Sequence, residues 1–198
     1  MRRAITLPAL LLVLVSASPE AGPLTEMERQ RLIAHLDMTE RWLADEVSRL
    51  SPAQLAFRPA PDAWNVMQVV DHLAVVGPIY WQDLQRAVQG PPGRAIASGT
   101  DDADILWYGI DRTYREKAIP SEVPKGQLRD AAEGLDAIRK QHAQLRQYIR
   151  TTSDDLRSRM VERQRSDAYQ WALLISTHEQ RHILQIREIK ADPKFPAK

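Results

Sequence analysis

The 198-residue chain contains no cysteine. This absence excludes disulfides, thiolate nucleophiles and cysteine-ligated zinc, so any metal site must be built from histidine, carboxylate and water ligands. Glycine is scarce, with 8 residues, and the sequence has no glycine-rich phosphate loop, internal repeat or low-complexity tract. No segment is predicted to form a β-strand.

Net charge is also nearly absent. The chain has 27 basic and 26 acidic side chains, which give a formal charge of +1. Such a balance gives no signal for binding to nucleic acid or to a membrane surface, and we expect no nucleic-acid partner. The 43% of hydrophobic residues is sufficient for the core of one domain of this length.

The first seventeen residues differ from the rest. Two arginines precede an apolar run at residues 4–15, and small residues follow it. This pattern is typical of a secretory signal peptide, whereas the run is short for a membrane span and no cysteine follows that could carry a lipid. We predict a cleaved signal peptide at 1–17, a linker at 18–24 and one folded domain at 25–198, in a periplasmic or secreted protein without a stable membrane anchor. The alternative is an uncleaved N-terminal anchor.

Four amphipathic segments predict an all-α fold, at about residues 25–50, 65–89, 127–150 and 167–190. The first opens with a capping box formed by Thr25 and Glu28, and Asn65 is suited to cap the second. The connection at 90–126 is long and has an apolar, aromatic middle, so we expect it to contain a short helix that covers one end of a four-helix bundle.

Two histidines near the C-terminus, His178 and His182, lie one helical turn apart. Residues four apart share a helix face, so both imidazoles can bind one divalent ion. Both belong to an apolar stripe with steps of three and four, which predicts that they face the interior. The members of this stripe are Ala168, Trp171, Ile175, His178, His182, Gln185 and Ile189. The alternative is a pair of partly solvated histidines bonded to carboxylates.

A third histidine, His72, falls on the stripe of the second segment together with Val69 and Val76. Burying an imidazole without a partner costs about 1–3 kcal/mol, and a shared metal ion would remove that cost. We therefore predict a metal site made by His72, His178 and His182. His35 is expected at the flank of the bundle, and His142 in the core or at the end of the bundle.

The string His178-Glu179-x-x-His182 also matches the zinc-peptidase signature, in which the glutamate is the general base. Such enzymes need a third ligand downstream, and Glu188, the nearby acid, projects from a different part of the helix. No strand is predicted that would bind a peptide. A peptidase is therefore disfavoured.

Three stretches resemble the DinB-like superfamily of metal-binding four-helix bundles. They are residues 57–73 (FRPAPDAWNVMQVVDHL), 167–171 (DAYQW) and 178–190 (HEQRHILQIREIK). The resemblance implies an up-down-down-up bundle with a long connection between helices two and three, a homodimer, and one divalent ion bound by His72, His178 and His182. Relatives include thiol-dependent transferases, isomerases and proteins described as metal-dependent hydrolases.

The export signal favours hydrolysis among these activities, because reduced thiol cofactors are scarce outside the cytoplasm. We predict a metal-dependent hydrolase of a small molecule, with zinc, nickel, iron or manganese and metal-activated water. Glu179 is the candidate general base, and Gln185 is expected to support a ligand or line the pocket. The alternatives are a non-catalytic metal- or ligand-binding bundle and, for a cytoplasmic protein, a thiol-dependent transferase.

Overall fold

The computed structural model describes residues 22–92 and 101–197. The predicted signal peptide and most of the predicted linker lie outside the described residues. Among those that are described, no helix has both the length and the apolar character needed to cross a membrane.

Four long helices form the fold, and shorter elements connect them. The elements are α1 (Glu26–Val47), α2 (Pro52–Ala56), α3 (Val66–Gln89), α4 (Asp102–Ile110), α5 (Ala131–Thr151), the 3-10 turn η1 (Leu156–Ser158), β1 (Met160–Val161), β2 (Ser166–Asp167) and α6 (Ala168–Lys190). The prediction of an all-α four-helix bundle is confirmed, and the long helices are α1, α3, α5 and α6. The two short strands, which pair antiparallel just before α6, were not predicted.

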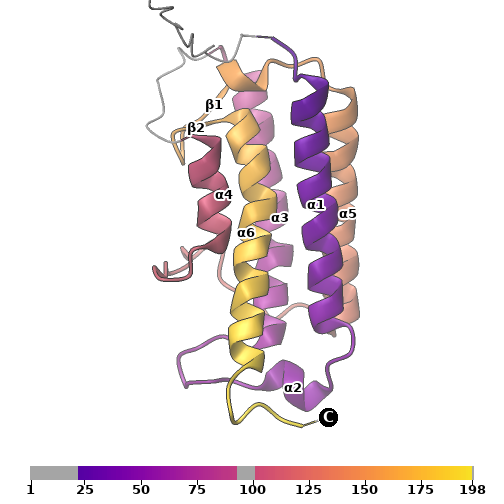
Figure 1. Ribbon diagram of the computed structural model, residues 1–198, viewed down its shortest axis with the longest axis vertical. Coiled ribbons are helices and arrows are strands. Elements are labelled where there is room, and N and C mark those ends of the chain that lie inside the picture. The colour runs from indigo at the N-terminus through magenta and orange to yellow at the C-terminus, as the bar shows by residue number, and fades with distance from the viewer. Residues whose placement is uncertain (1–21, 93–100, 198) are drawn as a thin grey trace, which may run out of the picture.

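The direction of the long helices is up-down-down-up (Figure 1). Helices α1 and α6 run one way, and α3 and α5 run the other way, so the connection between α3 and α5 must return along the length of the bundle. Each long helix packs against two others: α1 against α5 and α6, and α3 against α5 and α6. The α6 helix also packs against α4, so it is covered on most sides.

Side-chain caps fix the helix starts. Thr25, Asn65 and Asp167 are the N-caps of α1, α3 and α6, and each forms a reciprocal capping box with the residue three positions on. Ser51 caps α2 in the same way. The proline after it, Pro52, occupies the first turn of α2, where its missing N–H costs nothing.

The long connection contains the expected short helix, but α4 lies along the side of α6 rather than across an end of the bundle (Figure 1). The buried Arg181 of α6 explains this position. Its guanidinium donates to the carbonyls of Tyr108, Asp111 and Tyr114, at and beyond the C-terminal end of α4. A cation is favoured there because the carbonyl end of a helix carries partial negative charge.

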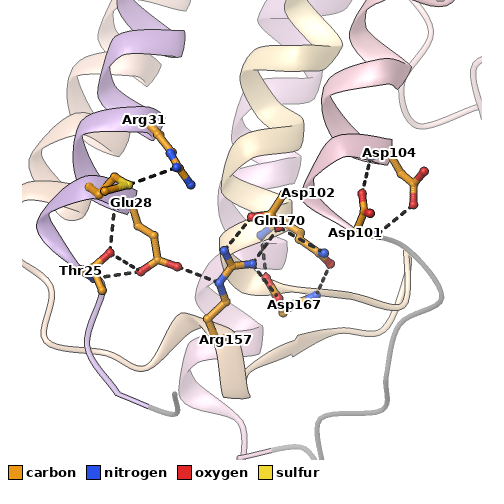
Figure 2. A network of polar contacts seen from close by, with 10 residues as sticks. Thr25, Glu28, Arg31, Asp101, Asp102, Asp104, Arg157, Asp167 and Gln170 are labelled. Carbon is orange, nitrogen blue, oxygen red and sulfur yellow. Dashed lines mark hydrogen bonds and ion pairs between the residues drawn. The ribbon is translucent and has the colours of Figure 1, made fainter. Parts of the chain in front are cut away.

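A single arginine joins the N-terminal ends of three helices (Figure 2). Arg157 donates to Glu28 of α1 at 3.0 Å, to both oxygens of Asp102 of α4 at 2.8 Å, and to Asp167, the N-cap of α6, at 3.2 Å. Its guanidinium also lies 3.7 Å from the ring centre of Tyr169. Burial would raise the pKa of Asp102, but the bonds from Arg157 lower it below its ordinary value.

The hydrophobic core consists of two clusters. One contains Leu36, Tyr80 and Trp171, and the other contains Leu43, Val70 and Ile183. Buried polar side chains lie near the boundary between these clusters on all four long helices. They include Thr39 of α1, His72 of α3, His142 of α5, and His178 and Glu179 of α6. The bundle therefore has a polar layer at mid-height, and buried polar groups require partners.

Candidate metal centre

The three predicted histidines converge. His72 comes from α3, and His178 and His182 come from successive turns of α6. The Nε2 atom of His178 lies 3.3 Å from that of His72 and 3.1 Å from that of His182. His72 and His178 are buried, His182 is half-buried, and the group is arranged so that it can hold a metal ion.

The other ring nitrogens set the tautomers of two of these histidines. Nδ1 of His72 lies 2.6 Å from the carbonyl oxygen of Glu122, and Nδ1 of His182 lies 2.8 Å from Oε1 of Gln185. A carbonyl oxygen only accepts, so each Nδ1 carries the proton and donates it. The Nε2 lone pairs are then free and point toward one another, which is the arrangement found in histidine metal ligands.

The spacing of the Nε2 atoms matches a metal site. Bonds of about 2.0–2.1 Å from tetrahedral zinc place two nitrogen ligands about 3.3 Å apart. The two observed separations are 3.3 and 3.1 Å. Nε2 of His178 can donate a hydrogen bond to only one of the other two Nε2 atoms, so at least one pair of lone pairs faces each other without a proton, and the donor set fits a divalent ion.

Burial also keeps the imidazoles uncharged. It lowers the pKa of His72 below the ordinary value, although the hydrogen bond to Glu122 opposes the shift. Burial lowers the pKa of His178 and His182 still further, and the neighbouring imidazoles add to this effect. Neutral imidazole is the form that binds metals, so the site is ready to accept an ion at neutral pH.

Aromatic rings and a loop enclose the histidines. The Trp64 ring centre lies 5.0 Å from that of His72 and 6.2 Å from that of His182, and Tyr80 lies 5.3 Å from His178. The loop that supplies the Glu122 carbonyl is attached next to His72 as well, because the N–H of Gly126 donates to Asp71 at 2.6 Å. Adjacent residues of α3 thus bind this loop at two points, Glu122 and Gly126.

Glu179, the candidate base, is directed toward other helices. Its Oε2 accepts from Thr39 of α1 at 2.7 Å and lies 3.2 Å from Nε2 of His142 of α5. Its Oε1 has no hydrogen-bonding partner among the described residues. Burial raises the pKa of this carboxyl, and the nearby His142 opposes the shift.

The polar chain continues from His142 to the surface. Nδ1 of His142 lies 3.3 Å from Oε2 of Glu40, which also accepts from Arg146 at 2.8 Å. The proximity of His142 lowers the pKa of Glu40, burial opposes this shift, and Arg146 lowers the pKa again, to about 2. The network shows that His142 belongs to the Glu179 side of the polar layer.

Two further placements complete the sequence-based expectations. Nδ1 of His35 in α1 lies 2.8 Å from the hydroxyl oxygen of Ser176 in α6. Gln185 supports His182, as proposed from its position one turn away. The contact with Glu122 could not be predicted from the sequence, because a backbone carbonyl leaves no side-chain signature.

Comparison with known proteins places the chain in a family. The sequence model of the DinB superfamily matches residues 24–186. The chain belongs to the DinB superfamily. It is 26% identical over 157 residues to YuaE of Bacillus subtilis (strain 168), a protein described as uncharacterized, and the match covers 76% of this chain and 91% of YuaE. No solved structure matches the chain.

Proposed function

We propose that this DinB-superfamily protein is a metal-dependent hydrolase of a small molecule. The observation that carries the proposal is the convergence of three neutral imidazoles, His72, His178 and His182, with their Nε2 atoms at metal-ligand spacing. When bound, a divalent ion makes a water molecule more acidic and polarises a substrate carbonyl.

Neighbouring residues set the tautomers of the histidines and pack around them. The Glu122 carbonyl and Gln185 hold the protons of His72 and His182 on Nδ1, so that Nε2 is available. The rings of Trp64 and Tyr80 pack beside the histidines and limit the access of water.

Metal binding is tested by elemental analysis and by titration of the full chain with Zn²⁺, Ni²⁺, Mn²⁺ and Fe²⁺. We expect one ion per chain in the wild type, loss of binding in His178→Ala with retained helical structure, and unchanged binding in the control His35→Ala. His35 is bonded to Ser176 and lies outside the cluster, so it controls for nonspecific histidine binding. Stoichiometric metal in His178→Ala would contradict the site.

Catalysis is tested by screening esters and amides with and without a chelator. Chelator-sensitive turnover supports the proposal, whereas metal binding without turnover supports a non-catalytic bundle, and turnover that needs a thiol supports a transferase. Glu179 as general base stays a prediction. Glu179→Gln should abolish hydrolysis and retain the ion if that prediction is correct.

We also propose that the protein is exported and forms a homodimer. Export is supported by the signal-peptide pattern at residues 1–17, and N-terminal mass spectrometry from the native host tests it. The proposed homodimer is supported by exposed apolar side chains in α4 and in the segment that follows it. Among them, Trp107 is 63% exposed and Tyr114 is 65% exposed. Light scattering of the purified protein measures the oligomeric state.

A further inference from the structure

Arg163 lies in the turn that joins β1 and β2. This turn has a fixed position in the fold, because β1 packs against α3 and β2 leads directly into α6. The N–H of Gln164 donates to the carbonyl of Val161 at 3.2 Å and closes the turn. The side chain of Arg163 therefore starts from a point that is fixed relative to α3 and α6, the two helices that carry the histidine cluster.

The guanidinium of Arg163 contacts two buried carboxylates. Its Nη2 donates to Oε1 of Glu122 in the loop before α5, and its Nη1 lies 3.5 Å from Oδ2 of Asp83 on α3. Only 7% of the Glu122 side chain and 9% of the Asp83 side chain are exposed. The guanidinium also lies 5.4 Å from the ring centre of Tyr80, which packs beside His178. Arg163 thus connects the hairpin to the loop next to the histidines.

Glu122 also contacts His72, through its backbone. Its carbonyl accepts from Nδ1 of His72 at 2.6 Å, so the two ends of one residue connect Arg163 to a candidate metal ligand. Of the described residues, only Arg163 forms an ion pair with Glu122. A buried carboxylate without a cation is costly. Without Arg163, Glu122 would turn its carboxylate toward water, and this movement would draw its carbonyl away from His72.

We propose that Arg163 is a positioning residue for His72, and that it acts through Glu122 to keep the proton of His72 on Nδ1. The hydrogen bond to the carbonyl leaves Nε2 of His72 free as a ligand atom. Metal affinity should therefore depend on a residue of the hairpin, which supplies none of the three ligands. This effect on affinity rests on the proposed function, whereas the effect on the tautomer of His72 does not.

The Zn²⁺ affinity of the full chain is measured first. Arg163→Met removes both ion pairs and keeps an unbranched side chain. Partners that orient a ligand histidine contribute about 10–100-fold to metal affinity, and we expect binding about tenfold weaker than in the wild type. Glu122→Met should weaken binding by a similar factor, although it retains the carbonyl that contacts His72. The double variant should bind no more weakly than either single variant, because both substitutions break the same link.

Two further variants are controls. Glu122→Gln keeps an oxygen that can accept from Arg163, so it should bind Zn²⁺ nearly as the wild type does. Arg86→Met removes a neighbouring arginine that pairs with Asp83 but, among the described residues, not with Glu122. Its Zn²⁺ affinity should equal that of the wild type.

The tautomer of His72 is measured on the metal-free chain by ¹⁵N NMR of the histidine side chains, and His72→Ala identifies its signals. We expect the proton on Nδ1 in the wild type and in Arg86→Met, and a mixture of the two tautomers in Arg163→Met and Glu122→Met. Circular dichroism checks that each variant is folded, so that a loss of stability is not mistaken for a change of tautomer. If Arg163→Met does not fold, Glu122→Met and Glu122→Gln provide the same comparison.

An unchanged tautomer of His72 in Arg163→Met would overturn the proposal. Losses of Zn²⁺ affinity that add in the double variant would also overturn it, because Arg163 would then act by a route other than Glu122. If the wild type binds no Zn²⁺, the proposed function fails, and the tautomer of the metal-free chain still decides the role of Arg163.

Discussion

The contact between Gln141 and the carbonyl of Ala74 permits a quantitative test by a double-mutant cycle. In an ordinary helix the N–H of residue 78 would donate to this carbonyl, but Pro78 has none. Gln141 supplies the missing donor at 2.9 Å. Gln141→Met keeps the length of the side chain and removes the donor, so it isolates the hydrogen bond from packing.

The expected size follows from the surroundings. Ala74 is half-buried, so water partly replaces the lost donor, and the net value of such a bond is about 0.5–1.5 kcal/mol. We expect Gln141→Met to lower the free energy of unfolding by about 1 kcal/mol, which is about 2–4 °C in Tm for a protein of this size. In a Pro78→Ala background the restored N–H satisfies the carbonyl, so the same substitution should cost nearly nothing there.

Urea unfolding, followed by circular dichroism, gives the four free energies, provided that the slope against urea is the same in all four proteins. The coupling between the two positions should be about 1 kcal/mol. Contact of the Gln141 side chain with other residues cancels in the cycle. An equal cost of Gln141→Met in both backgrounds would show that the bond to Ala74 contributes nothing to stability.

Three other substitutions test packing and charge by the same unfolding measurement. Gly134→Ala should cost about 1–3 kcal/mol, because its Cβ would overlap the side chain of Val70. The lowered pKa of Glu40, about 2 against 4.5, means that Glu40 stabilises the fold above pH 4.5 and that this contribution fades as the pH falls towards 2. Glu40→Gln should therefore be less stable than the wild type at neutral pH, and the difference should shrink towards zero as the pH falls through 2; a constant difference would contradict this. Arg157→Met should cost near the lower end of about 3–5 kcal/mol, since Asp102 and its neighbours keep some contact with water.

The helix starts and the histidine cluster were predictable because their signals are local. A capping box places its residues three apart, and the inward position of His178 follows from the spacing of apolar residues around it. His72 could be joined to the cluster because α3 has one clear apolar face. The family resemblance added the expectation that these two faces meet.

The direction of Glu179 was not predictable from the same spacing. Periodicity separates a buried face from an exposed one, but α6 is buried on most of its circumference, including Trp171, Glu179 and Arg181. A residue one position away from the histidine stripe can therefore point to another set of helices instead of the surface. The contact between His72 and the Glu122 carbonyl was not predictable for a different reason, because only the path of the loop brings this carbonyl to His72.

Arg157, at one end of the bundle, affects how the helix ends unfold locally. Glu28, Asp102 and Asp167 belong to the first turns, or to the cap, of helices that are far apart in the sequence, and one guanidinium contacts all three. Fraying of any one of these turns removes one partner of the Arg157 guanidinium, which also contacts the other two turns. Local unfolding at this end is therefore a joint event of α1, α4 and α6, whereas helix ends without such a link can fray independently.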